Sequence, residues 1–334
     1  MTIACGARLL VRLVLAAASG VALAQAAQVQ TIRVISLPGR PLPVVVAQSQ
    51  GIFSRYGIEV QVESAQNSEM LRANLANGTA DIAHAAVDNA VAMAEMAGAD
   101  VAIVIGGEGT LNELIAQPEI HSIADLRGRT VIVDAPNTAF ALQLKKILLT
   151  SGLQAGRDYE IKPVGATPLR LQAMRDHKEY AASMLGPPTS FLAKRDGFVS
   201  LGSARHFLGS YQAAGGFVRR QWAHDHSELL VRYLAAYVEA QRWLLSPANK
   251  QPVIELLTKE FHIPEPVASQ TYEVLVSSHQ GLADGARLDS EGFQNVLRLR
   301  AEVEGQWDGR VPSPEKYYDP SYYNQALSKL KSAR

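Results

Sequence analysis

The sequence predicts an α/β protein with two lobes, and three observations lead to this prediction. Short apolar runs typical of strands alternate with helical patterns of about ten to fifteen residues, as in parallel α/β layers. This alternation starts after residue 30 and begins again near residue 126. No flexible Gly/Ser linker separates the two halves, so we expect packed lobes rather than independent domains.

The first half carries four expected strands and three expected helices. Apolar alternation and continuous apolar runs predict the strands at 31–36, 58–64, 80–86 and 101–107. The helices are expected from the proline-rich loop 37–43 to about Gly51, over 68–76, and from Asp88 to just before Gly98. Asn77-Gly78 is a C-cap signal for the second helix, and Asp88 is expected to be the N-cap of the third.

The second half repeats this pattern. Its strands are expected within 126–136, at 159–164 and at 180–185. Its helices are expected at 138–150, 167–176 and 188–195. From residue 225 onward the chain is helical in character, and one long helix presents an apolar face at a spacing of three and four residues. That face consists of Leu230, Tyr233, Leu234, Tyr237, Gln241 and Leu244. Four tyrosines near the end are expected to dock the tail onto a lobe: Tyr317, Tyr318, Tyr322 and Tyr323.

Residues 1–26 are expected to be a secretory signal peptide. Arg8 and Arg12 form a positive start, residues 13–23 form an apolar run, and Ala22-Leu23-Ala24 has the form of a cleavage site. Cleavage is expected after Ala24 or Ala26, and the apolar run is shorter than the roughly 20 residues of a membrane span. The mature protein is therefore expected in the periplasm. The one cysteine, Cys5, would be removed with this segment.

Composition and motifs exclude several classes of function. The chain of 334 residues is 47% hydrophobic and has a formal net charge of zero, which argues against nucleic acid as the main partner. The G-x-G stretch at 106–112 lacks the third glycine of a dinucleotide site, and LNELIAQ after it favours a strand, so a turn between lobes is expected. No nucleophile motif is present, no partner is implied beside His84, and His224-x-His226 is best explained as a solvated helix start. The sequence therefore predicts no cofactor and no metal site.

Three helix starts that follow buried strands are the best candidates for a binding site. They begin at Asp88-Asn89, Asn137-Thr138 and Pro188-Thr189, and each offers unsatisfied N–H groups and a partial positive charge. Ligands of open α/β sheets bind at the carboxyl ends of strands, so these starts and the loop around Arg40 are expected to meet at one cleft. Asp88 suits an amine or hydroxyl, whereas Arg40 suits a carboxylate or sulfonate. A small polar or anionic organic molecule is the expected ligand.

Several segments resemble the exported substrate-binding proteins of ABC importers, in the branch that binds aliphatic sulfonates, taurine, nitrate and thiamine pyrimidines. The segments are AQSQGIFSRYGIEVQV, LANGTADIAHAAVDNAVA, the D-L-R-G-R-x-V run and SMLGPPTSFLAKRDG. The resemblance covers about residues 30 to 325. The pyrimidine synthases of the same superfamily use a cysteine-rich iron site, which the mature chain cannot form because it has no cysteine.

The resemblance implies a type II periplasmic-binding-protein fold, in which two α/β lobes are joined by a hinge of two crossings with a ligand cleft between them. Lobe 1 is expected at 31–112 plus 215–330, lobe 2 at 113–214, and the crossings near 111–115 and 214–217. The positions that match the family's ligand cleft are Leu37, Pro38, Gly39, Arg40, Ala86, Val87, Asp88, Asn89, Asn137, Thr138, Phe140, Gly186, Pro187, Thr189, Tyr211 and Gln212.

The resemblance further implies a monomeric transport component that is not an enzyme. It would capture a sulfonate, carboxylate or pyrimidine-like molecule by lobe closure and deliver it to an ABC permease. Two alternatives stay open. One is an exported cleft enzyme that uses His84 or Asp88 as a base, and the other is a ligand sensor for a membrane kinase.

Overall fold

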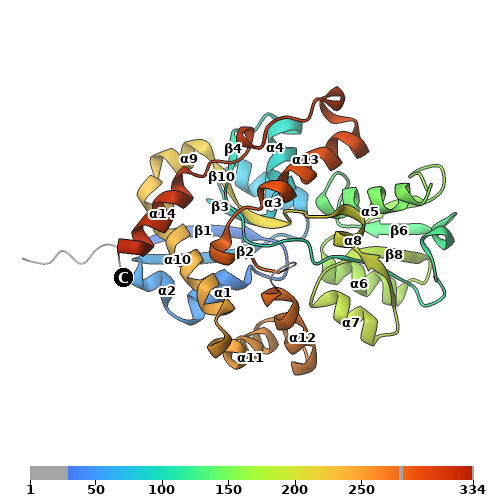
Figure 1. The fold of residues 1–334 in the computed structure, drawn as a ribbon, viewed down its shortest axis with the longest axis horizontal. Coiled ribbons are helices and arrows are strands. Elements are labelled where there is room, and N and C mark those ends of the chain that lie inside the picture. The colour runs from blue at the N-terminus through green and yellow to red at the C-terminus, as the bar shows by residue number, and fades with distance from the viewer. Residues whose placement is uncertain (1–28, 278–280, 333–334) are drawn as a thin grey trace, which may run out of the picture.

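The computed structural model describes residues 29–277 and 281–332, which form two α/β lobes side by side (Figure 1). Each lobe is built around a five-stranded mixed sheet, with the strand orders β2-β1-β3-β10-β4 and β7-β6-β8-β5-β9. We call the elements packed around these two sheets lobe 1 and lobe 2. The predicted signal peptide lies outside the described residues.

Lobe 1 combines the first third of the chain with the last third. Its strands are β1 (Gln30–Ser36), β2 (Ile58–Ser64), β3 (Ile82–Ala86), β4 (Val101–Ile105) and β10 (Ala214–Arg219). Its helices are α1 (Leu42–Ser49), α2 (Ile52–Arg55), α3 (Ser68–Ala76), α4 (Asp88–Ala97), α9 (Arg220–Asp225), α10 (Ser227–Leu245), α11 (Lys250–Phe261), α12 (Glu265–Val276), α13 (Ser290–Glu304) and α14 (Ser321–Ser332).

Lobe 2 is the middle of the chain. Its strands are β5 (Glu113–Ala116), β6 (Thr130–Val133), β7 (Glu160–Pro163), β8 (Tyr180–Leu185) and β9 (Val199–Ser203). Its helices are α5 (Ala139–Thr150), α6 (Thr167–Asp176), α7 (Thr189–Arg195) and α8 (Ala204–Leu208). In both lobes the parallel strands carry one inserted antiparallel strand next to the crossing, β10 in lobe 1 and β5 in lobe 2.

Two segments cross between the lobes. Residues 106–112 run from β4 to β5, and residues 209–213 run from α8 to β10. They lie side by side, because Gly109 pairs with Gln212 and the Thr110 N–H donates to the Tyr211 carbonyl at 3.1 Å. The crossings expected at 111–115 and 214–217 were placed too late in the chain. Sheet pairing in β5 and β10 continues to the edge of each crossing and takes up most of those residues.

The alternating pattern predicted from sequence is confirmed, and β2, α3, α6 and β8 have the expected bounds. The prediction of Asp88 as an N-cap is wrong, because α4 begins with Val87 at its N-cap and has no side-chain cap. The strands β9 and β10 were not predicted. In β10 the sequence AGGFVR carries two glycines, which are depleted in strands, and a Cβ on Gly215 would lie 2.5 Å from the Ile105 carbonyl oxygen.

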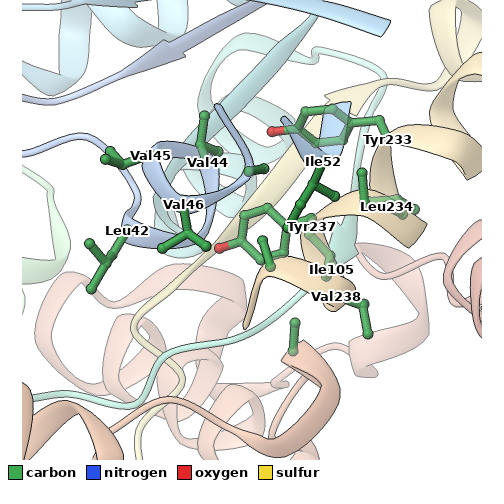
Figure 2. Close-up of a cluster of buried hydrophobic side chains, with 14 of the residues drawn as sticks. Leu42, Val44, Val45, Val46, Ile52, Ile105, Tyr233, Leu234, Tyr237 and Val238 are labelled. Carbon is green, nitrogen blue, oxygen red and sulfur yellow. The ribbon is translucent and has the colours of Figure 1, made fainter. Parts of the chain in front are cut away.

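The long helix α10 packs against α1 in the core of lobe 1 (Figure 2). Val44 and Val46 of α1 and Tyr233 and Leu234 of α10 are all completely buried in one cluster. The face predicted for this helix is confirmed, since all six of its residues are buried. Burial of each such side chain contributes on the order of 2 kcal/mol, so this contact anchors the C-terminal third onto lobe 1.

The tail returns to lobe 1, as predicted from its tyrosines. Tyr317 is 1% exposed and donates to Glu95 at 2.7 Å, and the Tyr323 hydroxyl donates to the Gly285 carbonyl at 2.8 Å. Over residues 29–277 and 281–332, no helix combines the length and apolarity that a membrane crossing requires.

Candidate ligand cavity between the lobes

A cavity of about 510 Å³ lies between the two lobes. Lobe 1 contributes residues 38–42 from the loop after β1 and the start of α1, together with parts of α11 and α12. Lobe 2 contributes Phe140 and the starts of α6 and α7, and the first crossing contributes Glu108, Leu111 and Asn112. A volume of this size is within the range of pockets that hold small organic ligands, about 300–1,000 Å³.

Arg170 organises the lobe 2 wall of the cavity. Its side chain is completely buried and donates to the carbonyls of Gly165 at 2.8 Å and Met184 at 2.9 Å. Its guanidinium lies 4.4 Å from the centre of the Phe140 ring, an arrangement that fixes both groups. Burial lowers the pKa of Arg170 to about 10, so the group keeps its charge at neutral pH. The Phe140 ring is therefore held in place by a buried cation beneath it.

The start of α7 forms a second part of the same wall. Residues 186–189 line the cavity, and a cis peptide bond joins Pro187 to Pro188. A Cβ on Gly186 would lie 2.7 Å from Asn112 Oδ1, closer than side-chain contacts allow. The Asn112 amide is itself held by a bond from its Nδ2 to Gln143 Oε1 at 2.9 Å. Glycine at this position therefore lets the α7 start approach the first crossing.

We expect Gly186→Ala to lower the free energy of unfolding by about 1–3 kcal/mol, because the added methyl group overpacks this contact. Urea unfolding measures the change. On an Asn112→Ala background the clash is removed, so the same substitution should cost much less. An equal cost on both backgrounds would contradict the contact with Asn112 as the cause.

The lobe 1 wall carries an ion pair. Arg40 donates to Glu260 of α11 and to Gln48 Oε1 at 3.0 Å. Both bonds use the guanidinium that was expected to hold a carboxylate or sulfonate. Arg40 lines the cavity, but its charge is already matched by Glu260. Phe261 and Ile263 complete this wall with apolar surface.

Glu108 contributes a carboxylate to the cavity from the first crossing. Its backbone pairs with Ala214 and Leu282, so the position of the residue is set by both crossings and by the chain before α13. Burial raises the pKa of Glu108 to about 7, and no neighbouring charge among the described residues counters this effect. The sequence alone does not point to this residue, because it lies in a G-x-G stretch that indicates a turn.

On the opposite side of the interface the lobes are in direct contact. Asp88 is 1% exposed, Arg300 is completely buried, and the two form a bidentate ion pair. Arg300 also donates to the Asn137 carbonyl of lobe 2 at 3.2 Å. A further bond across the interface runs from Ser68 Oγ to Asp134 Oδ2 at 2.8 Å. Burial lowers the pKa of Arg300, but attraction to Asp88 outweighs it and the net shift is upward.

The structure divides the predicted ligand residues into three groups. Seven line the cavity: Pro38, Gly39, Arg40, Phe140, Gly186, Pro187 and Thr189. Six do not line the cavity, and of these Asn137 bonds across the lobe interface: Ala86, Val87, Asp88, Asn89, Asn137 and Thr138. Leu37 is partly buried and packs against the core of lobe 1, and Tyr211 and Gln212 are buried in the second crossing.

The second group lies outside the cavity for a physical reason. Asp88 is held by an arginine that is 212 residues away in sequence, and Thr138 caps α5 and donates to Asp134 at 2.6 Å. Asn137 adopts a left-handed backbone with φ of 60° and donates to Met96. Because these polar groups bind each other, they hold the lobes together here. Gln212 is similarly engaged, since it donates to Ala214 at 2.8 Å and accepts from the Asp289 N–H.

The two histidine candidates for chemistry also lie away from the cavity. His84 lies in β3, the middle strand of the lobe 1 sheet, where it is bonded to the Tyr233 hydroxyl at 2.9 Å and stacked on Tyr237. Burial lowers its pKa to about 3, so it is neutral at physiological pH. His224 lies at the end of α9, and the described residues contain no group of three metal-binding side chains near it or elsewhere.

Comparison with known proteins supports this architecture. A profile described as NMT1/THI5 like matches residues 41–247. A search of curated proteins finds no match. Among solved structures, the periplasmic nitrate-binding protein NrtA from Synechocystis PCC 6803 matches with a TM-score of 0.76 and 14% identity, over 91% of this chain and 90% of that one.

Two further solved structures are similar. The alkanesulfonate-binding protein SsuA from Xanthomonas axonopodis pv. citri, bound to MOPS, has a TM-score of 0.70 and 18% identity, over 86% of this chain and 96% of that one. The desulfurization enzyme DszB has a TM-score of 0.62 and 14% identity, over 90% of this chain and 99% of that one. At these identities the similarity shows the shared periplasmic-binding fold and no specific ligand.

Proposed function

The chain belongs to the NMT1/THI5-like family, and from this premise we propose that it is the exported solute-binding component of an ABC importer. It captures a small polar organic molecule between its lobes and delivers it to a membrane permease. The two similar proteins named above as binders of nitrate and alkanesulfonate support this function. The monomeric state and the periplasmic location belong to the same proposal.

The observation that carries the proposal is that one cavity takes its walls from both lobes. Phe140 comes from lobe 2 and Phe261 from lobe 1, so one ligand can contact both at once. A ligand that bridges the lobes favours the closed arrangement by the difference in its affinity for the two states. Closure would proceed about the two adjacent crossings, as in hinged binding proteins.

An enzyme with the same fold is the competing function, and DszB provides the example. The bases considered for such an enzyme were His84 and Asp88. Neither residue lines the cavity. In addition, His84 is neutral within the sheet, and Asp88 is paired with Arg300. These two residues therefore give no support to an enzyme, and binding without turnover is our proposal. A sensor for a membrane kinase would use the same cavity, and a partner experiment would be needed to distinguish it.

We expect both Phe140→Ala and Phe261→Ala to weaken binding of the ligand by about 10-fold, because truncating a buried aromatic contact costs more than about 1 kcal/mol. The ligand is first found by a thermal-shift panel of sulfonates, carboxylates, pyrimidines, amines and nitrate. A compound at one hundred times its Kd stabilises the protein by about 2.7 kcal/mol, enough to raise Tm by several degrees.

Leu149→Ala on the exposed side of α5 is the matched control, since this leucine is 38% exposed and does not line the cavity. Calorimetry gives the affinities, and small-angle scattering reports whether the ligand compacts the protein. Loss of affinity in only one phenylalanine variant, without compaction, would contradict capture between the lobes. If the protein converts a compound to a product and does not keep any compound bound unchanged, an enzyme would be favoured.

A further inference from the structure

We infer that the ligand is a small organic cation, a protonated amine on an apolar body, and that Glu108 binds its charge. This inference rests on the proposed function, since it names the ligand class of the same cavity. The sequence predicts a small polar or anionic organic molecule, and this inference proposes a cation instead of an anion. Four features of the cavity wall support it: a carboxylate with no ion-pair partner among the described residues, two matched arginines, a scarcity of N–H donors and apolar surfaces.

Among the described residues, Glu108 is the carboxylate of the cavity lining that has no ion-pair partner. It lines the cavity, is partly buried, and makes its backbone bonds to Ala214 and Leu282, which leave the side chain uncommitted. Burial raises the pKa of its carboxylate, and the described residues form no salt bridge or hydrogen bond with that carboxylate. A partly buried carboxylate without a partner is unfavourable in the empty protein, and a ligand cation would remove that cost.

The two arginines whose side chains line the cavity are already matched. Arg40 is bonded to Glu260, and Arg175 is bonded to Asp196 through Nε at 2.8 Å and Nη2 at 2.6 Å. An anionic ligand would have to break one of these pairs or enter beside Glu108. With both pairs intact, Glu108 is the charged side chain of the lining that has no ion-pair partner among the described residues. The Arg170 charge lies behind the Phe140 ring and not in the lining, so the unpaired charge that a ligand meets in the cavity is negative.

The helix starts at the cavity are poor in N–H donors. Three helices begin there, and their positive ends alone would favour an anion. Five prolines line the cavity at or near these starts, and none has an N–H to donate. They are Pro38, Pro41, Pro168, Pro187 and Pro188. The usual backbone cradle of an anion is thus largely missing, while Leu111, Leu192, Phe140 and Phe261 offer apolar surface for the body of the ligand.

Few other titratable groups face Glu108. From α10 the nearest is Tyr237, whose pKa is raised by burial and by the Glu108 charge, so it stays neutral. Arg40, Arg175 and Glu260 line the same cavity from the loop after β1, from α6 and from α11. Because the pKa of Glu108 is about 7, its charge disappears in mildly acidic solution. Cation binding should therefore weaken as pH falls.

The test uses three probes with the same body: phenethylamine, phenethyl alcohol and phenylpropionate. By calorimetry at about pH 8 we expect phenethylamine to bind at least about 10-fold more tightly than the other two, and Glu108→Gln to remove this advantage. Glu255→Gln on the exposed face of α11 is the matched control and should leave the affinities unchanged. At about pH 5.5 the amine should bind the wild-type protein about 30-fold more weakly, since its ammonium stays charged while Glu108 is protonated.

The thermal stability of Glu108→Gln without ligand provides an independent test. Burial disfavours the Glu108 charge, so Glu108→Gln should raise Tm at about pH 8, and this gain should shrink as pH falls. Binding of phenethylamine near pH 7 should also release protons, which calorimetry in two buffers detects. An affinity for phenethylamine that Glu108→Gln leaves unchanged would overturn the inference.

The failure of this inference can be told apart from failure of the proposed function. If phenylpropionate or a sulfonate binds tightly and compacts the protein, the solute-binding function stands and the cation inference is wrong. If neither these probes nor any compound of the panel binds, both are wrong.

Discussion

Replacing Arg300 with methionine should lower the free energy of unfolding by about 3–5 kcal/mol, because the substitution removes the ion-pair partner of the buried Asp88 charge. Asp88 is 1% exposed, so water cannot take over the role of the guanidinium. The same change removes the bonds to the Asn137 carbonyl and to Gln306 Oε1. Urea unfolding measures this loss of free energy, and calorimetry should show a fall in Tm of about 10 °C.

Two further variants identify the cause. Arg298→Met lies on the exposed face of the same helix and should change the stability by less than about 0.5 kcal/mol. The double variant Asp88→Asn with Arg300→Met removes the isolated charge and should recover a large part of the loss. A loss in Arg300→Met no greater than in Arg298→Met would mean that the ion pair contributes little to stability.

Arg300 also connects the pair to the lobe interface. Its bond to Asn137 reaches from α13 of lobe 1 to the loop before α5 of lobe 2, where α13 and α5 also pack (Figure 1). In Arg300→Met the open arrangement should therefore gain population. Small-angle scattering of the apo protein, at a temperature where the variant is folded, should then report a larger radius of gyration than for Arg298→Met.

Arg170→Met is expected to have the second largest effect, a loss of about 3 kcal/mol in stability. The substitution leaves two buried carbonyls, of Gly165 and Met184, and the hydroxyls of Ser183 and Thr167 without this donor. Each unsatisfied group costs about 1–3 kcal/mol. Part of this total loss is offset, because the variant no longer has to bury a charged guanidinium. Arg170→Lys should be nearly as harmful, because an ammonium cannot reach four acceptors arranged around a planar group.

Arg170→Met should also weaken ligand binding, since Phe140 loses the group beneath its ring. Calorimetry with the best compound of the panel measures this loss, and urea unfolding measures stability. Arg195→Met, on the exposed end of α7, is the matched control for both. Unchanged affinity in a destabilised Arg170→Met protein would show that Phe140 keeps its position without the guanidinium.

The sequence by itself determined the layered architecture. Strand and helix periodicity depends on which side chains are apolar at spacings of two or about 3.6 residues, and this is local information. The bounds of β2, α3, α6 and β8 were therefore predicted correctly, as was the buried face of α10. The helix starts at Asn137-Thr138 and Pro188-Thr189 were also found, because capping and proline signals lie within a few residues.

Only the tertiary structure decided which helix starts face the cavity and which charges are free. Asp88 and Arg40 were judged by their own side chains, yet each is matched by a distant residue, Arg300 and Glu260. Such pairs join elements separated by 212 and 220 residues, and no local pattern encodes them. Glu108 was missed for the converse reason. The G-x-G stretch that contains it indicates a turn, and no local pattern shows that its carboxylate would lie in the cavity without an ion-pair partner among the described residues.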